Sequence, residues 1–427
     1  MPDPLSILIV GCGLSGLASA LALAQAGHKV TVFERSSKLQ EIGAGIQLSP
    51  NATRLLQHWG VFPSVLAAGD KPEYGAFRSY RGDVLSASPP VSHPALTSEF
   101  PYIVIHRADL LRALLTGAEQ DGVDITLKLS SEVQDIDFNT PSLRLSTGEV
   151  LSGDLILGAD GERSRCRGLL LGRPDPPYSP GDVVYRVSVP TAGIKKGDRS
   201  WELVSRSSVN FWMGAGGHVV AYPIQEGVLN IVLVYAEGST GGDGKVMYGP
   251  QKAGIEEFRS KISNWDPVLH ELIGVEGAVC MKWTLFQIHE LGGWRHGRGR
   301  FAVIGDAAHA ILPCLAQGAA QAFEDAGVLG GIFSQGVTRE QIPDALRVFE
   351  QVRKPRASQV RHRTLDQKAM FAFPDGFEQR ERDARLRAGA DYRLFEWIWG
   401  YDAFESGREA WKEALGTGRE LYESGRL

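Results

Sequence analysis

The chain has 427 residues, of which 43% are hydrophobic and 22% are charged, and this is the composition of an ordinary globular protein with two or three domains. Its net charge of −5 argues against a nucleic-acid-binding surface, and no apolar stretch approaches the length of a membrane span. The four cysteines have no metal or redox spacing, and the N-terminus lacks the pattern of a signal peptide. We therefore expect a cytoplasmic protein with no bound metal, no nucleic-acid partner and no membrane span.

The first predicted group of elements is a strand, a glycine turn, a helix and a second strand within residues 5–35. The apolar run Ile7-Leu8-Ile9-Val10 leads directly into Gly11-Cys12-Gly13-Leu14-Ser15-Gly16, which opens the helix, and the second strand ends next to Glu34. This context predicts a dinucleotide site, because the pyrophosphate of such a ligand lies at a helix N-terminus. Glu34, about 20 residues further on, is placed to accept a hydrogen bond from a ribose hydroxyl. The loop alone does not decide which dinucleotide binds.

The middle of the chain carries the patterns of a second domain. Residues 73–95 are rich in Pro and Ser and predict a strand excursion, and a helix is expected at 107–120. A buried strand follows at 155–158 and ends in a turn at Asp160. Residues 182–236 contain several runs that alternate between apolar and polar residues, so they predict an antiparallel sheet.

A second strand-to-glycine turn lies far downstream. Phe301-Ala302-Val303-Ile304 runs into Gly305-Asp306-Ala307-Ala308-His309, so the Asp306 carboxylate follows a strand and precedes a helix. A carboxylate in this position can reach a polyol such as the ribityl chain of a flavin. The next helix begins with small residues, Gly318 and Ala319, which let backbone N–H groups approach a ligand. The two turns together predict a flavin, although the second turn alone is equally compatible with a plain helix-capping aspartate.

Three motifs therefore occur in a fixed order along the chain. The first is the Gly11–Gly16 turn with Glu34, and the second is Asp160-Gly161-Glu162-Arg163-Ser164-Arg165-Cys166-Arg167. The third runs from Gly305 to Pro313 and continues over residues 317–326. This combination resembles the single-component, FAD-dependent aromatic hydroxylases (class A flavoprotein monooxygenases), in particular their salicylate-hydroxylase-like branch. Residues 41–52 and 397–402 are also similar to this branch, so the resemblance covers essentially the whole chain.

The resemblance implies an α/β fold with a Rossmann-like FAD-binding domain of the GxGxxG type, an inserted antiparallel-sheet substrate domain and a helical C-terminal part. We expect the FAD-binding domain to comprise residues 1–72, 96–178 and 282–370. The substrate domain then takes residues 73–95 and 179–281, and the helical C-terminal segment takes residues 371–427. Both a monomer and a homodimer are compatible with the sequence.

The resemblance also implies which residues hold FAD. Glu34 and Arg35 are expected at the adenosine ribose, Asp306 at the ribityl chain and Pro313 against the isoalloxazine ring. The other contacts implied are Gly11, Gly13, Gly16, Gly45 and Gln47 (beside the flavin), Arg107 (at the middle of FAD), Val133 (at adenine, through its backbone), Asp160, Gly318 and Ala319.

The activity implied by the resemblance is oxygen transfer to a small aromatic substrate. NADH or NADPH reduces FAD, the reduced flavin reacts with O₂ to a C4a-hydroperoxide, and the distal oxygen passes to an activated arene. Because ionisation makes a phenol more nucleophilic, the site needs a cation or base near the hydroxyl, and it needs to exclude water. Arg186, in the middle sheet, is expected to bind a substrate anion. His218 and Tyr222 are four residues apart on one strand and share a face, so they are candidates for proton handling.

Several alternatives stay open at this stage. Arg186 is also compatible with a salt-bridged surface residue, and His218 and Tyr222 with polar residues at a sheet edge. The reaction is compatible with decarboxylating, salicylate-type hydroxylation, with dearomatisation of a polyketide phenol, and with epoxidation of an indole or alkene. A non-catalytic flavoprotein that senses redox state is the alternative from another class. Ile288-His289-Glu290 departs from the sequence common among salicylate-type relatives, so the substrate is not fixed.

Overall fold

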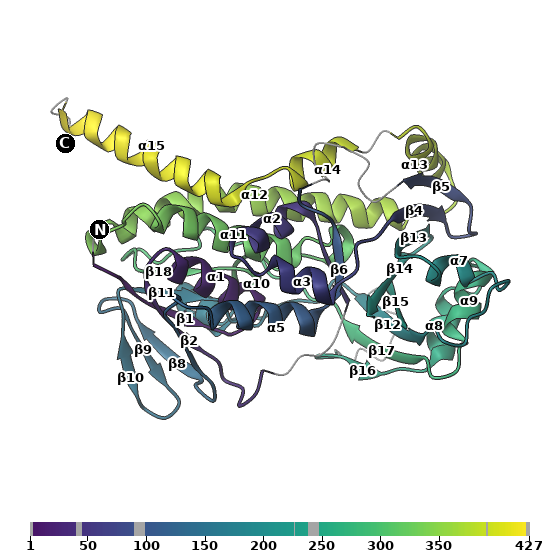
Figure 1. Ribbon diagram of the computed structural model, residues 1–427, viewed down its shortest axis with the longest axis horizontal. Helices are drawn as coiled ribbons and strands as arrows, with labels where there is room; N and C mark the ends of the chain where they lie inside the picture. The colour runs from purple at the N-terminus through teal and green to yellow at the C-terminus, as the bar shows by residue number, and fades with distance from the viewer. Residues whose placement is uncertain are drawn as a thin grey trace.

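The computed structural model describes residues 3–39, 45–88, 99–225, 227–237, 247–389 and 392–423. A parallel sheet and a larger sheet lie at opposite ends of the molecule, and long helices run above both (Figure 1). Both chain termini lie at the end that holds the parallel sheet. The Rossmann-like α/β fold with an inserted sheet and a helical C-terminal part is confirmed.

The parallel sheet has five strands in the order β18-β11-β1-β2-β7. Its central strand β1 is apolar and almost entirely buried, as expected for a parallel strand with helices on both faces. Helix α1 (Leu14–Gln25) follows β1 directly and packs against α5 (Arg107–Ala118) and α11 (Gly318–Phe333). The strands are β1 (Ser6–Val10), β2 (Lys29–Phe33), β7 (Ile125–Lys128), β11 (Leu155–Gly158) and β18 (Phe301–Val303).

The larger sheet has eight strands in the order β16-β17-β12-β15-β14-β13-β4-β5. Neighbouring strands are antiparallel except β13 and β4, which run parallel, because the earlier β4–β5 hairpin joins the sheet at its edge. The strands are β4 (Tyr74–Ser79), β5 (Val84–Ser88), β12 (Asp182–Pro190), β13 (Ser208–Gly214), β14 (Gly217–Gln225), β15 (Val228–Ala236), β16 (Gln251–Lys252) and β17 (Val279–Thr284).

The two faces of the larger sheet have different neighbours. On β12, Tyr185 and Val187 point into a core that is closed by residues of α8 (Ile255–Lys261) and α9 (Pro267–Ile273). Val184 and Arg186, which alternate with them, line a cavity on the opposite face. Because side chains alternate along a strand, one set faces the core that the helices cover and the other set lines the cavity.

Helix α12 (Ile342–Phe371) runs from the parallel sheet toward the larger sheet, and α15 (Ala403–Glu423) packs on α11 (Figure 1). In the described part of the chain, no helix combines the length and apolar character that a membrane crossing requires. The remaining elements are β3 (Gly45–Leu48), β6 (Ile103–His106), β8 (Val133–Asp137), β9 (Ser142–Leu145), β10 (Val150–Ser152), α2 (Pro50–His58), α3 (Phe62–Ala68), α6 (Arg165–Leu171), α7 (Trp201–Val204), α10 (Asp306–His309), η1 (Pro313–Leu315), η2 (Arg339–Gln341), α13 (Phe377–Arg387) and α14 (Tyr392–Trp399).

Candidate active site

The three glycines of the first turn have three different surroundings. Gly11 has φ +105°, and a Cβ there would lie 2.5 Å from the carbonyl oxygen of Ala159. A Cβ at Gly16 would lie 1.9 Å from the carbonyl oxygen of Gly11, so the helix packs closely on the strand. A Cβ at Gly13 meets nothing within 4 Å. These are the roles expected of a pyrophosphate-binding turn, in which the second glycine keeps space for the ligand.

Glu34 is held next to the first glycine turn by two backbone hydrogen bonds. Its two carboxylate oxygens accept hydrogen bonds from the backbone N–H groups of Cys12 (3.1 Å) and Ser36 (2.9 Å). Burial opposes ionisation, but these hydrogen bonds and the neighbouring Arg35 outweigh it, so the pKa of Glu34 lies below its ordinary value. Glu34 is therefore an ionised acceptor beside the glycine turn, while Arg35 is exposed.

The second glycine turn touches the first. A Cβ at Gly305, which has φ +57°, would lie 2.4 Å from Oγ of Ser15. That hydroxyl is buried and has no hydrogen-bond partner among the described residues. A buried hydroxyl without a protein partner, placed between two strand-to-helix turns, is available to donate a hydrogen bond to a bound anion. The two turns therefore fit the expected dinucleotide together.

A buried ionic network fixes the second turn from behind. Oδ2 of Asp325 accepts hydrogen bonds from the backbone N–H of Gly305 (2.8 Å) and from Nε2 of His309 (2.7 Å). Oδ1 of Asp325 pairs with Nε of Arg353 (2.8 Å), and Arg353 also pairs with Glu324 (2.6 Å). Burial would raise the pKa of Asp325, but His309 and Arg353 outweigh it and lower that pKa. His309 therefore has a structural position behind the Asp306 turn.

A cavity of about 290 Å³ opens on the front of this turn. Its wall brings together Arg107 at the start of α5, Asp306 at the start of α10 and Pro313 in η1. Arg186 reaches the same cavity from the larger sheet. Segments that are far apart in the sequence thus supply the cations, the carboxylate and the proline expected around the middle of the cofactor.

The other predicted cofactor residues occupy several positions. Gly45 and Gln47 line a second cavity, and a Cβ at Gly318 meets nothing within 4 Å at the start of α11, where Ala319 follows. Val133 is buried at the start of β8, outside both cavities. Their contacts with a cofactor stay predictions.

The carboxylate of Asp160 is already hydrogen-bonded to protein groups at the start of α6. Its carboxylate accepts hydrogen bonds from the hydroxyl of Ser164 and from the backbone N–H groups of Arg165 (2.7 Å) and Cys166 (3.0 Å). From the same motif, the buried Arg167 donates to the carbonyl oxygens of Ala307 and His289. The described contacts of this motif thus order its own turn and reach the second glycine turn at Ala307, and a direct contact of Asp160 with a cofactor stays a prediction.

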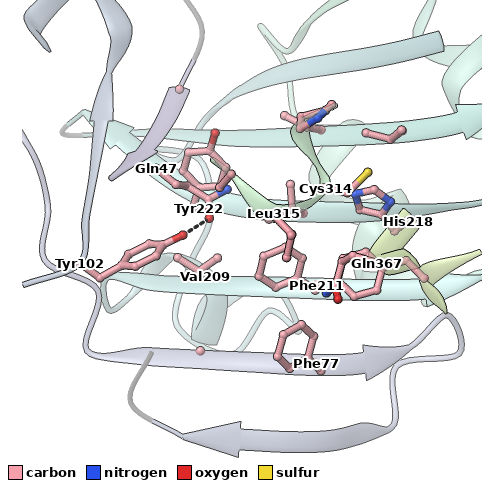
Figure 2. Close-up of a pocket in the computed structure, with 18 of the residues that line it drawn as sticks. Gln47, Phe77, Tyr102, Val209, Phe211, His218, Tyr222, Cys314, Leu315 and Gln367 are labelled. Atoms are coloured by element: carbon pink, nitrogen blue, oxygen red, sulfur yellow. Dashed lines mark hydrogen bonds between the residues drawn. The ribbon is translucent and has the colours of Figure 1, made fainter. Parts of the chain in front are cut away.

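The second cavity has a volume of about 430 Å³ and lies on the free face of the larger sheet (Figure 2). Arg186, His218 and Tyr222 all line it, so the structure brings the three predicted substrate residues together. Much of the remaining wall is apolar or aromatic, including Phe77, Phe211, Val220, Leu315, Phe371, Phe395 and Trp399.

Arg186 is a buried cation on the wall of this cavity. Its side chain is 9% exposed, and Nε donates to Oδ1 of Asn230 (2.8 Å) while Nη2 lies 3.4 Å from Oγ of Ser188. No ion pair among the described residues includes Arg186. Since a buried charge normally has a counter-charge, this arrangement favours an anionic ligand.

Tyr222 belongs to a polar group that the sequence pattern only partly indicated. The hydroxyl of Tyr102, just before β6, donates to Oε1 of Gln47 in β3 (2.5 Å; Figure 2). Burial raises the pKa of Tyr222 to about 12, against the opposing effects of Gln47, Arg186 and Asn230. Tyr102 and Asn230 were missed because their partners Gln47 and Arg186 lie on strands from separate segments of the chain. For Asn230 the available signal was its place in the stretch 182–236 that predicted an antiparallel sheet.

His218 has a different environment. It is 4% exposed and its ring lies 4.9 Å from that of Phe371. Burial, with a smaller effect of the Lys368 cation, lowers the pKa of His218 to about 3. The imidazole is therefore neutral around pH 7 and is a weak base. We expect it to hydrogen-bond as a neutral group, and its predicted share in proton handling stays a prediction.

Known proteins match both glycine turns. The family described as FAD binding domain matches residues 5–173 and 282–364. The FAD-dependent monooxygenase OpS4 of Beauveria bassiana (strain ARSEF 2860) is 34% identical over 419 residues, covering 94% of this chain and 96% of that protein. The 3-amino-4-hydroxybenzoate 2-monooxygenase PtmB3 of Streptomyces platensis is 32% identical over 93% of this chain and 96% of its own length.

Solved structures share the fold. Salicylate hydroxylase in a substrate complex superposes with a TM-score of 0.77 at 24% identity, covering 95% of this chain and 98% of that one. CtdE in complex with FAD and its substrate 4 gives a TM-score of 0.80 at 20% identity, covering 97% of this chain and 100% of that one. At these identities the likeness shows the arrangement of the elements alone.

Proposed function

The chain belongs to the FAD-dependent monooxygenases that contain the FAD binding domain, and from this premise we propose that it hydroxylates a phenolic substrate with O₂, using NADH or NADPH as the reductant. The curated relatives include enzymes named for oxygenation of aromatic compounds, 3-amino-4-hydroxybenzoate and 6-hydroxynicotinate. They support an aromatic substrate for this chain and disfavour the redox-sensing alternative.

The observation that carries the proposal is the junction between the two cavities. Both are lined by Arg186, Trp283 and Pro313, so the cavity with Asp306 and the cavity with Tyr222 adjoin. A cofactor in the first would present its ring to a molecule in the second. When bound, FAD supplies the electrons and the activation of O₂.

The residues around the junction have distinct proposed roles. Gly13, Glu34 and Asp306 hold the cofactor. Arg186 binds and orients the substrate through its anion, and its charge favours the phenolate form of a nearby hydroxyl. Tyr222 hydrogen-bonds that hydroxyl, and the apolar wall excludes water from it.

The proposed division of the chain follows these roles. Residues 1–72, 96–178 and 282–370 form the cofactor domain, residues 73–95 and 179–281 form the substrate domain, and residues 371–427 close the assembly. Within these ranges, residues 1–2, 40–44, 89–98, 226, 238–246, 390–391 and 424–427 lie outside the described part of the chain.

The test is oxidation of NADH and NADPH by the FAD-loaded protein with a panel of phenolic acids under ¹⁸O₂. We expect a matching phenol to stimulate oxidation of one of the two nucleotides and to gain one ¹⁸O atom in a hydroxylated product. Nucleotide oxidation with no labelled product for any phenol that binds would contradict the proposal. A labelled non-aromatic product would instead favour dearomatisation or epoxidation.

A further inference from the structure

One wall of the cavity on the large sheet comes from α14, near the C-terminal end of the chain. Phe395 and Trp399 of this helix both line the cavity. They are four positions apart and share a helix face, and their ring centroids lie 4.7 Å apart. Trp397, on the opposite face of the helix, is 38% exposed. Helix α14 therefore lies between the cavity and the solvent, with an aromatic face toward the cavity.

Trp399 lies near the part of the cavity that is expected beside the flavin, the flavin end, which Gly45 and Gln47 line. The ring of Trp399 is 5.9 Å from the ring of Tyr102. The hydroxyl of Tyr102 in turn donates to Oε1 of Gln47 (2.5 Å). A tryptophan ring in this position covers a large apolar area, so it suits a wall that keeps water out of the flavin end.

A single arginine of α12 holds the C-terminal end of α14. Nη2 of Arg356 donates to the carbonyl oxygen of Ile398 (2.9 Å), and Nη1 lies 3.5 Å from that of Trp397. The guanidinium also lies over the rings of Tyr401 and Trp397, at 3.8 and 4.7 Å from their centroids. The last carbonyl groups of a helix have no partner within it, and a cation there is favourable for the helix dipole. Arg356 therefore fixes the helix end at which Trp399 lies.

The same guanidinium is bound to the region proposed for the cofactor. Nε and Nη2 of Arg356 pair with the two carboxylate oxygens of Glu324 in α11, at 2.6 and 2.8 Å. Asn51 of α2 donates to that carboxylate (2.7 Å) and to Oε1 of Gln317 (3.1 Å), which directly precedes α11. All four of these side chains are buried. Arg356 therefore connects α14 to the start of α11, where backbone N–H groups are expected beside the flavin.

We infer that Trp399 closes the flavin end of the substrate cavity to solvent, and that Arg356 is the positioning residue that holds Trp399 there. The inference rests on the proposed function and deepens it, because oxygen transfer to a substrate requires the exclusion of water. Arginine suits this position because its planar fork binds a carboxylate and backbone carbonyl groups while its faces stack on aromatic rings. A lysine ammonium keeps the charge and loses this geometry.

The first test measures the access of acrylamide, a quencher of flavin fluorescence, to the FAD-loaded protein without substrate. Trp399→Ala removes the ring from the wall, so we expect the quenching constant to rise at least about twofold. Trp201→Ala removes a half-buried tryptophan of α7 that packs on the core at the other face of the sheet. It is the matched control and should keep the wild-type constant. If Trp399→Ala does not retain FAD, Trp399→Leu takes its place in the same measurement.

The second test releases Trp399 without removing it. In Arg356→Lys the ammonium still pairs with Glu324 but does not hold the end of α14, so we expect amide hydrogen exchange in α14 to become about tenfold faster. The quenching constant should rise as in Trp399→Ala. Arg361→Lys is the matched control, because Arg361 lies on the same helix and also donates to a backbone carbonyl, that of Ile288 (2.7 Å). It should leave exchange in α14 and the quenching constant unchanged.

The double variant Arg356→Lys/Trp399→Ala shows whether Arg356 acts through Trp399. Its quenching constant should equal that of Trp399→Ala alone, because the ring that Arg356 holds is already absent. An arginine with only a structural role would lower the free energy of unfolding and leave the quenching constant of the folded protein unchanged.

Three results would overturn the inference. The first is a wild-type quenching constant in both Trp399→Ala and Trp399→Leu. The second is exchange in α14 that is equally fast in Arg356→Lys and Arg361→Lys, and the third is a double variant in which the two effects add. Both measurements are made without substrate or turnover. If they give the expected results but no phenol is oxygenated, only the proposed function falls, and if phenols are oxygenated while quenching is unchanged, only the inference falls.

Discussion

The proposed cofactor region and the proposed substrate cavity of this protein are shaped by different parts of the chain. The cofactor region is shaped by backbone, since Gly11, Gly16 and Gly305 sit where any Cβ would collide with a neighbour. The substrate cavity is shaped by side chains that alternate along β12 and β14. A backbone site tolerates few substitutions, whereas a side-chain site changes its ligand through single substitutions. We therefore expect substitutions in the two regions to have different effects on FAD retention and on substrate binding.

Gly13→Val gives the largest expected effect and separates cofactor loss from misfolding. A Cβ at Gly13 meets no protein atom within 4 Å, so we expect a side chain there to enter the space proposed for the pyrophosphate. We expect a folded protein that retains no FAD after purification, measured by flavin absorbance and circular dichroism. Gly193→Val, at an exposed loop glycine that is equally open, is the control and should remain yellow. Stoichiometric FAD in Gly13→Val would show that this turn has another role.

Arg353→Met tests whether the cofactor region depends on the ionic network behind it. The substitution leaves Glu324 and Asp325 as buried, undercompensated carboxylates, and breaking such a network costs about 3–5 kcal/mol. We expect a matching loss of unfolding free energy in urea and weaker FAD retention. Arg347→Met removes an exposed ion pair on the same helix and should cost at most about 1 kcal/mol. Equal losses in the two variants would remove the network from this role.

Asp306→Ala removes one acceptor from the cofactor region without disturbing the backbone. A hydrogen bond to a charged group contributes about 1.5–3 kcal/mol, so FAD affinity should fall roughly tenfold to a hundredfold. Flavin fluorescence titration of the apoprotein measures this change. An affinity equal to that of the wild type would place Asp306 outside the cofactor contacts.

His218 predicts a pH effect that belongs to the substrate cavity alone. Its folded pKa is lowered from 6.5 to about 3, so below pH 6.5 the unfolded chain takes up a proton that the folded chain does not. The contribution of His218 to stability therefore falls as the pH drops from about 6.5 toward 3, by about 2 kcal/mol between pH 7 and pH 5.

His218→Leu should remove this contribution, which urea unfolding at pH 7 and pH 5 would measure. The exposed His362→Leu should keep the wild-type loss at low pH. The same loss in His218→Leu would show that the imidazole is not buried as a neutral group.

Arg186→Lys is the mildest change and should leave the cofactor region untouched. Lysine keeps the charge but loses the planar guanidinium that bonds Asn230 and a ligand together. We expect full FAD occupancy, a KM for the aromatic substrate raised several-fold and more H₂O₂ released per nucleotide oxidised. Unchanged KM and coupling would place the substrate anion elsewhere.

The same contrast explains what the sequence could predict. Gly11, Glu34 and Gly305 lie in short motifs whose geometry is local, so the fold class and both turns were readable from the residues. Arg186, His218 and Tyr222 were readable as residues of one sheet face because strand alternation is also local. The pairing of Tyr102 with Gln47 was not, since it joins β6 to β3 through long-range pairing.

The low pKa of His218 could not be predicted from the sequence either, because residues of α12 cause it. Phe371 covers the imidazole and Lys368 adds a nearby cation, and both residues come from that helix. A histidine on a strand shows neither its cover nor its charged neighbours in its own sequence. The protonation state of a candidate base therefore required the packed structure.

The contact between Ser15 and Gly305 has a consequence for biosynthesis. The ribosome releases the Gly11–Gly16 turn first, but β18 and α11, which complete the sheet edge and cover α1, are encoded after residue 300. Most of the chain must therefore be synthesised before both glycine turns of the proposed cofactor pocket are available. While the inserted sheet is being synthesised, part of the apolar helix α1 in the early βαβ segment is exposed, because α11 has not yet been made.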